Sequence, residues 1–213
     1  MAFRIPAALR GRRLVVVDVE GNGRTMPEII EIATLATDTG AADMTSEADV
    51  RSWLIRPVAP ITAVVTRTVH GISNAEVAAC PTWSVVAGEV ATVLADRVLV
   101  AHHASVEHRV LSAHLPSWAP PAVLDTLQLA KRVWPGLSEG YSLSALTTHA
   151  GIDPGEFASV GRHRAAYDTW CTWQLFSRLV EDGGLTWDRL LAAAARSSTA
   201  VPHAARVNEP EGL

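Results

Sequence analysis

Two carboxylates, Asp18 and Glu20, close an otherwise apolar run in the segment RRLVVVDVE, residues 12–20. The β-branched run predicts a buried strand, in which side chains two residues apart point to the same face. Two neighbouring carboxylates at the end of an apolar strand are unfavourable unless a positive group binds them. The pair therefore predicts a cation site. The alternative is that both acids simply mark the solvated end of the strand.

Three further residues could join such a site. Glu107 lies in the first turns of a predicted helix, five residues after the strand-like segment 97–102. His163 and Asp168 lie in GRHRAAYD, and in one continuous helix their side chains would point about 140° apart. They can converge only if the helix begins just after His163, which leaves the histidine on a loop that Gly161 permits. Taken singly, each of the three is better explained as a solvated surface residue.

Taken together, the five residues indicate one chemistry. Four of them offer only carboxylate oxygens: Asp18, Glu20, Glu107 and Asp168. Oxygen ligands suit Mg²⁺ or Mn²⁺, whereas zinc would favour histidine or cysteine. Two such ions about 3.5–4 Å apart are a common means of displacing a phosphodiester in line. A histidine on a loop suits a general base, so His163 is expected to take a proton from the attacking water.

Hydrophobic periodicity places these residues in an α/β domain. Three strand patterns come first, with short links that favour an antiparallel meander, and they are followed by alternating helices and strands. The predicted strands are 12–20, 28–37, 51–56, 97–102 and 122–127, the last of which runs into a further helix, and the other predicted helices are 82–95, 104–115, 142–150, 164–181 and 186–196. The pattern predicts a mixed sheet flanked by helices.

Composition sets the limits of the prediction. Hydrophobic residues make up 48% of the 213 residues, which suits one globular domain, expected over 1–183. An appended helix and a flexible tail are expected over 184–213. No apolar run is long enough for a membrane span and no leader is evident, so we expect a cytoplasmic protein without membrane contact. Two divalent cations would neutralise the formal net charge of −4, which favours a small pocket for a strand end over a broad nucleic-acid surface.

Three blocks of the sequence carry a family resemblance. They are VVVDVEGNG with EIIEIATL at residues 15–35, LVAHHASVEHRVL at 99–111, and HRAAYD at 163–168. In this order and spacing the chain resembles the DnaQ-like exonucleases of the DEDDh branch from about residue 12 to 182. The resemblance implies a ribonuclease-H-like fold, with a five-stranded sheet of three antiparallel strands and then two parallel ones.

The resemblance also implies an activity. It is a 3′–5′ exonuclease that uses two Mg²⁺ or Mn²⁺ ions and releases nucleoside 5′-monophosphates from a single-stranded 3′ end. The metal ligands would be Asp18, Glu20, Glu107 and Asp168, and the substrate-binding residues would be Gly21, Asn22, Gly23 and His103. Arg164, beside His163, is a further candidate to bind a phosphate, and a role on the surface or in capping the helix is the equal alternative. DNA and RNA both remain open as substrate, as do a homodimer and a larger replication, repair or RNA-processing assembly.

Three departures from the family pattern motivate an alternative function. Glu107 stands where the family has aspartate, and its extra methylene moves the carboxylate by roughly one C–C bond. His103 replaces the usual asparagine and Val106 the usual phenylalanine. Gly21–Gly23 replaces the family's continuation after the first block, a stretch that contacts the terminal nucleotide. The alternative is a module that binds nucleic acid or a partner and has lost efficient catalysis.

Overall fold

Five strands form one mixed sheet in the order β5-β3-β2-β6-β7. The structure is a computed structural model that describes residues 3–37 and 44–199. The strands are β2 (Leu14–Gly21), β3 (Ile29–Thr37), β5 (Val50–Leu54), β6 (Val98–Ala101) and β7 (Val123–Asp125). β3 pairs antiparallel with both β2 and β5, whereas β6 pairs parallel with both β2 and β7. The predicted sheet of three antiparallel and then two parallel strands is confirmed.

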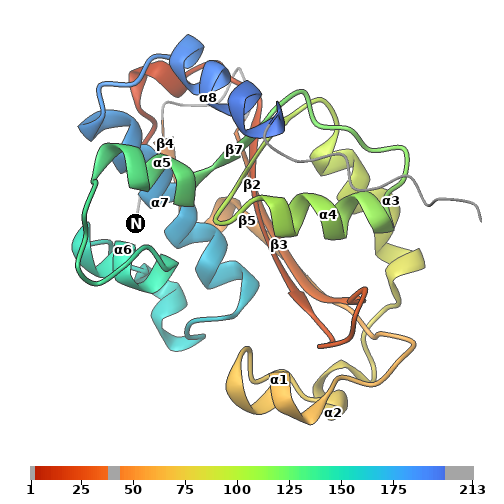
Figure 1. The fold of residues 1–213 in the computed structure, drawn as a ribbon. Helices are drawn as coiled ribbons and strands as arrows, with labels where there is room; N and C mark the ends of the chain where they lie inside the picture. The colour runs from red at the N-terminus through yellow and green to blue at the C-terminus, as the bar shows by residue number, and fades with distance from the viewer. Residues whose placement is uncertain (1–2, 38–43, 200–213) are drawn as a thin grey trace, which may run out of the picture.

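Helices cover both faces of this sheet (Figure 1). They are α1 (Ala63–Thr68), α2 (Asn74–Val77), α3 (Trp83–Leu94), α4 (Ser105–His114), α5 (Thr126–Val133), α6 (Leu143–His149), α7 (Ala165–Asp182) and α8 (Trp187–Thr199). Strands β1 (Phe3–Arg4) and β4 (Met44–Thr45) form a separate two-stranded sheet. The elements α1, α2, β1 and β4 were not predicted, because elements this short leave no periodic pattern in the sequence.

The side chains of β2 point alternately to its two faces, and each face packs in a separate hydrophobic core. Leu14 and Val16 belong to the core under α5, α6, α7 and α8. Val15 and Val17 belong to the core under α3 and α4. Because the side-chain period of a strand is two, Asp18 continues the row of Val16 and faces the α7 side. The helices α4 and α7 therefore lie on opposite sides of the strand that ends in the carboxylate pair (Figure 1).

Helix α7 is almost entirely buried, with Trp170 and Trp173 packed in the larger core. Its first residues, Ala165 and Ala166, pack against Ala33 of β3. Three alanines at one contact let the helix backbone approach the sheet closely, and the Thr169 hydroxyl donates to the Ala33 carbonyl at 3.3 Å. The start of α7 is thus fixed beside the end of β2.

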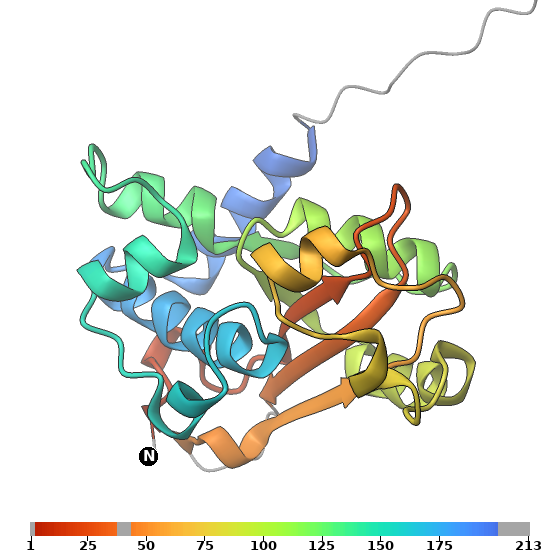
Figure 2. The ribbon, with the colours of Figure 1, turned by 90° about the horizontal axis from the view of Figure 1, so that it is seen from below.

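Helix α1 packs on the loop between β2 and β3, at the end of the sheet where β2 finishes (Figure 2). The Thr62 amide donates to the Asn22 carbonyl at 3.0 Å. Gly23 has φ +77°, and a Cβ there would collide with Thr62 and would come within 2.8 Å of Val65. A glycine is therefore required at position 23 for α1 to pack on this loop.

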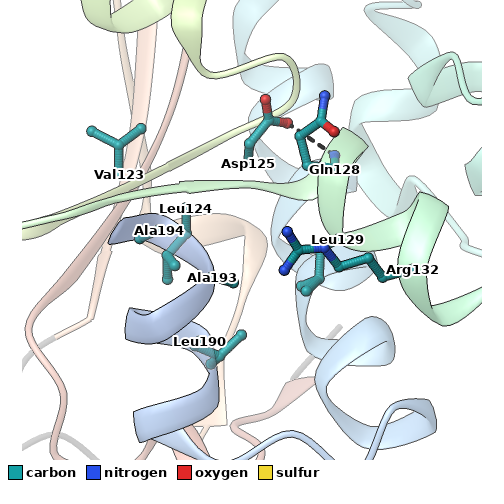
Figure 3. A pocket seen from close by; sticks show the side chains of 9 residues that line it. All are labelled: Val123, Leu124, Asp125, Gln128, Leu129, Arg132, Leu190, Ala193 and Ala194. Carbon is teal, nitrogen blue, oxygen red and sulfur yellow. Dashed lines mark hydrogen bonds between the residues drawn. The ribbon is translucent and has the colours of Figure 1, made fainter. Parts of the chain in front are cut away.

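Helix α8 packs on the domain rather than extending from it. Leu190 is buried in the larger core, and it lies with Ala193 and Ala194 next to Leu124 of β7 and Leu129 of α5 (Figure 3). The expected helix over 186–196 is present and runs to Thr199, whereas the expected tail from residue 200 lies outside the described residues. The division of the chain at residue 183 stays a prediction. Within the described residues, the helices are too short or too polar to span a bilayer.

Candidate active site

A cleft of about 760 Å³ opens between the end of β2, the start of α4 and the helices α5, α6 and α7. The residues predicted to do chemistry all line it: Asp18, Glu20, Glu107, His163 and Asp168. His103, predicted to bind substrate, lines it as well. The other predicted substrate-binding residues, Gly21, Asn22, Gly23 and Arg164, are not part of its lining.

The four carboxylates come from strand β2 and from the first turns of two helices. Asp18 and Glu20 project from the same face of β2, and the ladder with β3 shifts register between Glu20 and Gly21. A bulge of this kind commonly ends strand pairing beside an active site. Glu107 projects from the first turn of α4 and Asp168 from the first turn of α7. Glu20, Glu107 and Asp168 are each less than 10% exposed.

His163 lies on the loop before α7, as the sequence predicted. Its backbone is left-handed at φ +60°, and its amide donates to the Asp168 Oδ2 at 3.0 Å. This turn brings a ring nitrogen of His163 and a carboxylate oxygen each of Glu20 and Asp168 to within 4.8 Å of one another. The side chain is exposed at the cleft, so solvent reaches it. The predicted convergence of His163 and Asp168 depends on this break in the helix.

The buried acids repel one another and resist ionisation. Burial, and then the charges of Asp168 and Glu20, raise the pKa of Asp18 well above its usual range. Burial raises the pKa of Glu20 and of Glu107 to about 8, with Asp168 adding to the effect on Glu20. Burial also raises the pKa of Asp168 to about 6, although the neighbouring His163 counteracts it. A divalent cation bound among these four acids would favour their ionised forms and offset the repulsion between them.

The donor set fits hard divalent cations. Asp18 Oδ2 and Glu107 Oε2 are buried without a hydrogen-bond partner among the described residues. A buried carboxylate oxygen without a partner is rare and calls for a ligand. The donors are carboxylate oxygens with one histidine beside them, which suits Mg²⁺ or Mn²⁺ better than zinc. That these residues bind metal stays a prediction, and so does the effect of Glu107 in place of aspartate.

The pKa shifts predict how the stability of the metal-free protein depends on pH. Between pH 5 and 8 the carboxyls of Glu20 and Glu107, whose ordinary pKa is 4.5, are largely ionised in the unfolded chain, whereas in the folded chain they keep their protons up to about pH 8. The unfolded state therefore binds fewer protons, and stability falls as the pH rises. In EDTA we expect the melting temperature to fall by roughly 5 °C or more from pH 5 to 8.

Added Mn²⁺ should restore the melting temperature, and more so at pH 8 than at pH 5, because a ligand that binds only the folded state stabilises it. The variant Glu107→Gln is the control, since it should flatten the pH dependence. A melting temperature in EDTA that is constant or rises between pH 5 and 8 would show that these acids are ionised in the metal-free fold.

Arg164, a candidate to bind a phosphate, is not part of the cleft lining. Its guanidinium forms a two-pronged ion pair with Glu31, with Nε–Oε2 and Nη2–Oε1 distances of 3.1 Å, and a further pair with Glu76 at 3.3 Å. Glu31 Oε2 also accepts from the Ala165 amide at 2.9 Å and so caps the start of α7. The arginine thus clamps α7 to β3 and α2 and does not line the cleft, which agrees with the alternative role at the start of the helix; its contact with a phosphate stays a prediction.

Glu31 was not singled out in the sequence. It is 4% exposed and lies directly opposite Glu20 in the β2–β3 register. The hairpin register was the signal that could have placed it beside the carboxylate pair. Its partner is 133 residues away along the chain, and nothing local indicates that contact.

The predicted substrate loop Gly21–Gly23 also turns inward. Asn22 is fully buried, its Oδ1 accepts from the Glu28 amide at 3.1 Å, and its Nδ2 donates to Glu28 and to the Ala59 carbonyl at 3.3 Å. The Asn22 side chain thus holds the loop in this structure, and its predicted contact with substrate stays a prediction. Gly21 packs on Pro27, where a Cβ would come within 2.8 Å.

The two histidines of the second sequence block, His102 and His103, lie in the turn between β6 and α4. His103 has φ +64°, a conformation that asparagine and histidine adopt more readily than most residues, and its amide donates to Asp125 at 3.1 Å. His102 is used structurally, because its ring nitrogens contact the Thr126 hydroxyl at 2.9 Å and the Tyr141 carbonyl at 3.1 Å. His103 can thus replace asparagine without disturbing the turn.

Comparison with known proteins yields a family. The sequence model of the RNase_T family, described as exonuclease, matches residues 15–176, a segment that includes all five predicted catalytic residues. A DNA polymerase III subunit epsilon-like protein of Rhodobacter capsulatus is 35% identical over 172 residues, which cover 78% of this chain. The match spans only 23% of that relative's length.

Two further likenesses extend over most of both partners. Exodeoxyribonuclease 10 of Escherichia coli (strain K12) is 29% identical over 185 residues, covering 87% of this chain and 76% of the relative. The solved structure of exonuclease X in complex with 5′ overhanging duplex DNA aligns with a TM-score of 0.68 at 28% identity, covering 85% of this chain and 99% of that one. The predicted ribonuclease-H-like fold is confirmed.

Proposed function

The chain belongs to the RNase_T family of exonucleases, and on this premise we propose that it removes nucleotides from the 3′ end of a single DNA strand with two divalent cations. The observation that carries the proposal is the group of buried carboxylates with unpartnered oxygens beside an exposed histidine in one cleft. DNA is proposed as the substrate because the names of relatives at 28–29% identity refer to exodeoxyribonuclease activity and to a DNA complex.

Each residue of the cleft has a defined part in the proposed reaction. Asp18, Glu20, Glu107 and Asp168 would hold two Mg²⁺ or Mn²⁺ ions. Such ions, when bound, would lower the pKa of an attacking water and stabilise the negative charge on the departing 3′-oxygen. His163 accepts the proton of that water at a ring nitrogen, which the turn before α7 holds near Asp168. Cleavage of the last phosphodiester releases a nucleoside 5′-monophosphate.

The position of the base follows from the fold around it. The left-handed turn at His163 and the Glu31 cap at Ala165 fix the backbone on both sides of Arg164. The imidazole is therefore carried on an ordered turn and is still exposed to solvent. A base held in this way can exchange its proton with water after each cleavage.

Degradation of labelled oligonucleotides tests the proposal. Single-stranded DNA and RNA, each labelled at the 5′ end in one sample and at the 3′ end in another, are incubated with Mg²⁺, Mn²⁺ or EDTA. We expect the 5′-labelled strand to shorten stepwise and the 3′-labelled strand to release a labelled mononucleotide first, only with metal. Faster degradation of RNA would reassign the substrate.

Two results would contradict the proposal. Release of a labelled mononucleotide from the 5′ end would reverse the polarity. Binding of the strand without divalent ions, together with no shortening under any metal, would instead favour the binding module that the departures at Glu107 and Gly21–Gly23 suggested.

A further inference from the structure

Two cations, Lys131 and Arg162, line the same cleft as the carboxylates. Lys131 is exposed on α5, with its Nζ 5.9 Å from the ring centroid of Tyr141, and Arg162 is exposed on the loop before α7. Neither forms an ion pair with an acid among the described residues, in contrast to Arg164. Arg162 does hydrogen-bond the Tyr167 side chain, and it lies near enough to Asp168 to lower the pKa of that acid. Both cations are nevertheless exposed in the lining of the cleft, where an anion can reach them.

The cleft continues beyond these cations. A second hollow of about 390 Å³ lies at the turn between α5 and α6, and it shares Ser142, Ser144 and Arg162 with the first. Its lining also includes the acid Glu139. The two hollows therefore adjoin at Ser142, Ser144 and Arg162, and the second offers a strand a way out of the first.

A nucleic-acid strand brings more than one phosphate to such a site. In the proposed reaction, metal ions at the carboxylate cluster would neutralise the scissile phosphate. The phosphates on its 5′ side lie away from those ions, so lysine or arginine side chains must neutralise them. The formal net charge of −4 offers no general attraction for a polyanion, so local cations must supply it. Hydroxyls such as those of Ser142 and Ser144 are common partners of the phosphate backbone.

We propose that Lys131 and Arg162 form a second phosphate subsite, which binds the backbone of the strand on the 5′ side of the scissile bond and leads it toward the α5–α6 turn. This inference rests on the proposed function and deepens it, because it gives the direction of the strand through the cleft. It also assigns the sequence-independent part of substrate binding to two residues.

Comparison of two substrates tests the subsite. One is a single-stranded DNA oligonucleotide, and the other is the p-nitrophenyl ester of thymidine 5′-monophosphate, which has one phosphodiester and no phosphate beyond it. The variants are Lys131→Gln and Arg162→Gln. The matched control is Arg132→Gln, because Arg132 lies next to Lys131 on α5 but on the side that faces α8 (Figure 3).

We expect each subsite variant to lose roughly tenfold more kcat/KM on the oligonucleotide than on the ester, and Arg132→Gln to show no such difference. Equilibrium binding of a fluorescent strand, measured by anisotropy with Ca²⁺, gives a second readout. The slope of log affinity against log salt concentration should become shallower by about 0.7 for each variant, the value for one phosphate contact on a single strand.

Equal losses on both substrates, or an unchanged salt slope in both variants, would overturn the subsite. If the wild-type protein binds the strand but cleaves neither substrate, the proposed function fails instead. The salt slope alone then supports or overturns the subsite.

Discussion

Replacement of Asp18 by asparagine is expected to lower exonuclease activity by about 10³-fold and, in EDTA at pH 8, to raise the melting temperature by several degrees. Both effects have one cause. Asp18 Oδ2 is buried without a partner, and its neighbours raise the pKa of the carboxyl far above its usual range. An amide of the same shape removes a metal ligand, and it also replaces repulsion with a donor toward Glu20 or Asp168.

Activity by the ladder assay and thermal unfolding in EDTA measure the two effects on the same preparation. Asp96→Asn is the matched control, because Asp96 is 85% exposed and has φ +55°, which asparagine tolerates, so neither activity nor stability should change. Activity of Asp18→Asn within tenfold of the wild type would exclude Asp18 as a ligand. Parallel loss of activity and stability would show that Asp18 supports the fold rather than the reaction.

Replacement of His163 by alanine should reduce the turnover number by roughly 10²–10³-fold, the range expected when a general base is removed. The side chain is exposed, and its contact with Asp168 is made through the backbone amide, which alanine keeps. We therefore expect Mn²⁺ affinity to stay within a few-fold of the wild type. Single-turnover cleavage and Mn²⁺ titration measure the two quantities separately.

Chemical rescue sharpens this prediction. Because His163 is open to solvent, free imidazole should restore part of the lost rate in His163→Ala and leave Asp18→Asn inactive. A variant that keeps its turnover within a few-fold would remove His163 from the reaction. A variant that loses Mn²⁺ binding in parallel with its rate would make the histidine a ligand instead of a base.

The structure separates an acid that supports the fold from acids that are proposed to bind metal. Glu31 and Asp18 face the same region, but Glu31 is satisfied by the Arg164 guanidinium and the Ala165 amide. Asp18 has an unpartnered oxygen in the same surroundings. A protein that needed these acids only for stability would pair them all, because an unpaired buried carboxylate is strongly unfavourable.

Local pattern was sufficient to predict the strands, the pairing of Asp18 with Glu20 on one face, and the break before α7, whereas the order of the strands was implied by the family resemblance. The period of two in β2 placed Asp18 and Glu20 on one face, away from Val15 and Val17. The angular argument about His163 and Asp168 correctly required α7 to begin after the histidine. These features follow from neighbours along the chain, which is why a single sequence was enough.

Long-range contacts set the limit of that prediction. The ion pair of Arg164 with Glu31 was not predicted, because Glu31 lies on a distant strand. The hydrogen bonds of Asn22 to Glu28 and Ala59 were not predicted either, because the sequence does not show that the loop folds inward. Lys131 lies on α5 and Arg162 on the loop before α7, and only the packing of α5 against α7 places both at the cleft.

The most direct test of the account counts metal and cleavage in the same samples. Protein stripped with EDTA is titrated with Mn²⁺, bound ions are counted by electron paramagnetic resonance, and shortening of a 5′-labelled single strand is followed in parallel. We expect two Mn²⁺ ions per chain, activity that rises as they bind, and loss of both in Asp18→Asn. Shortening without bound metal, or two bound ions with no shortening of DNA or RNA, would contradict it.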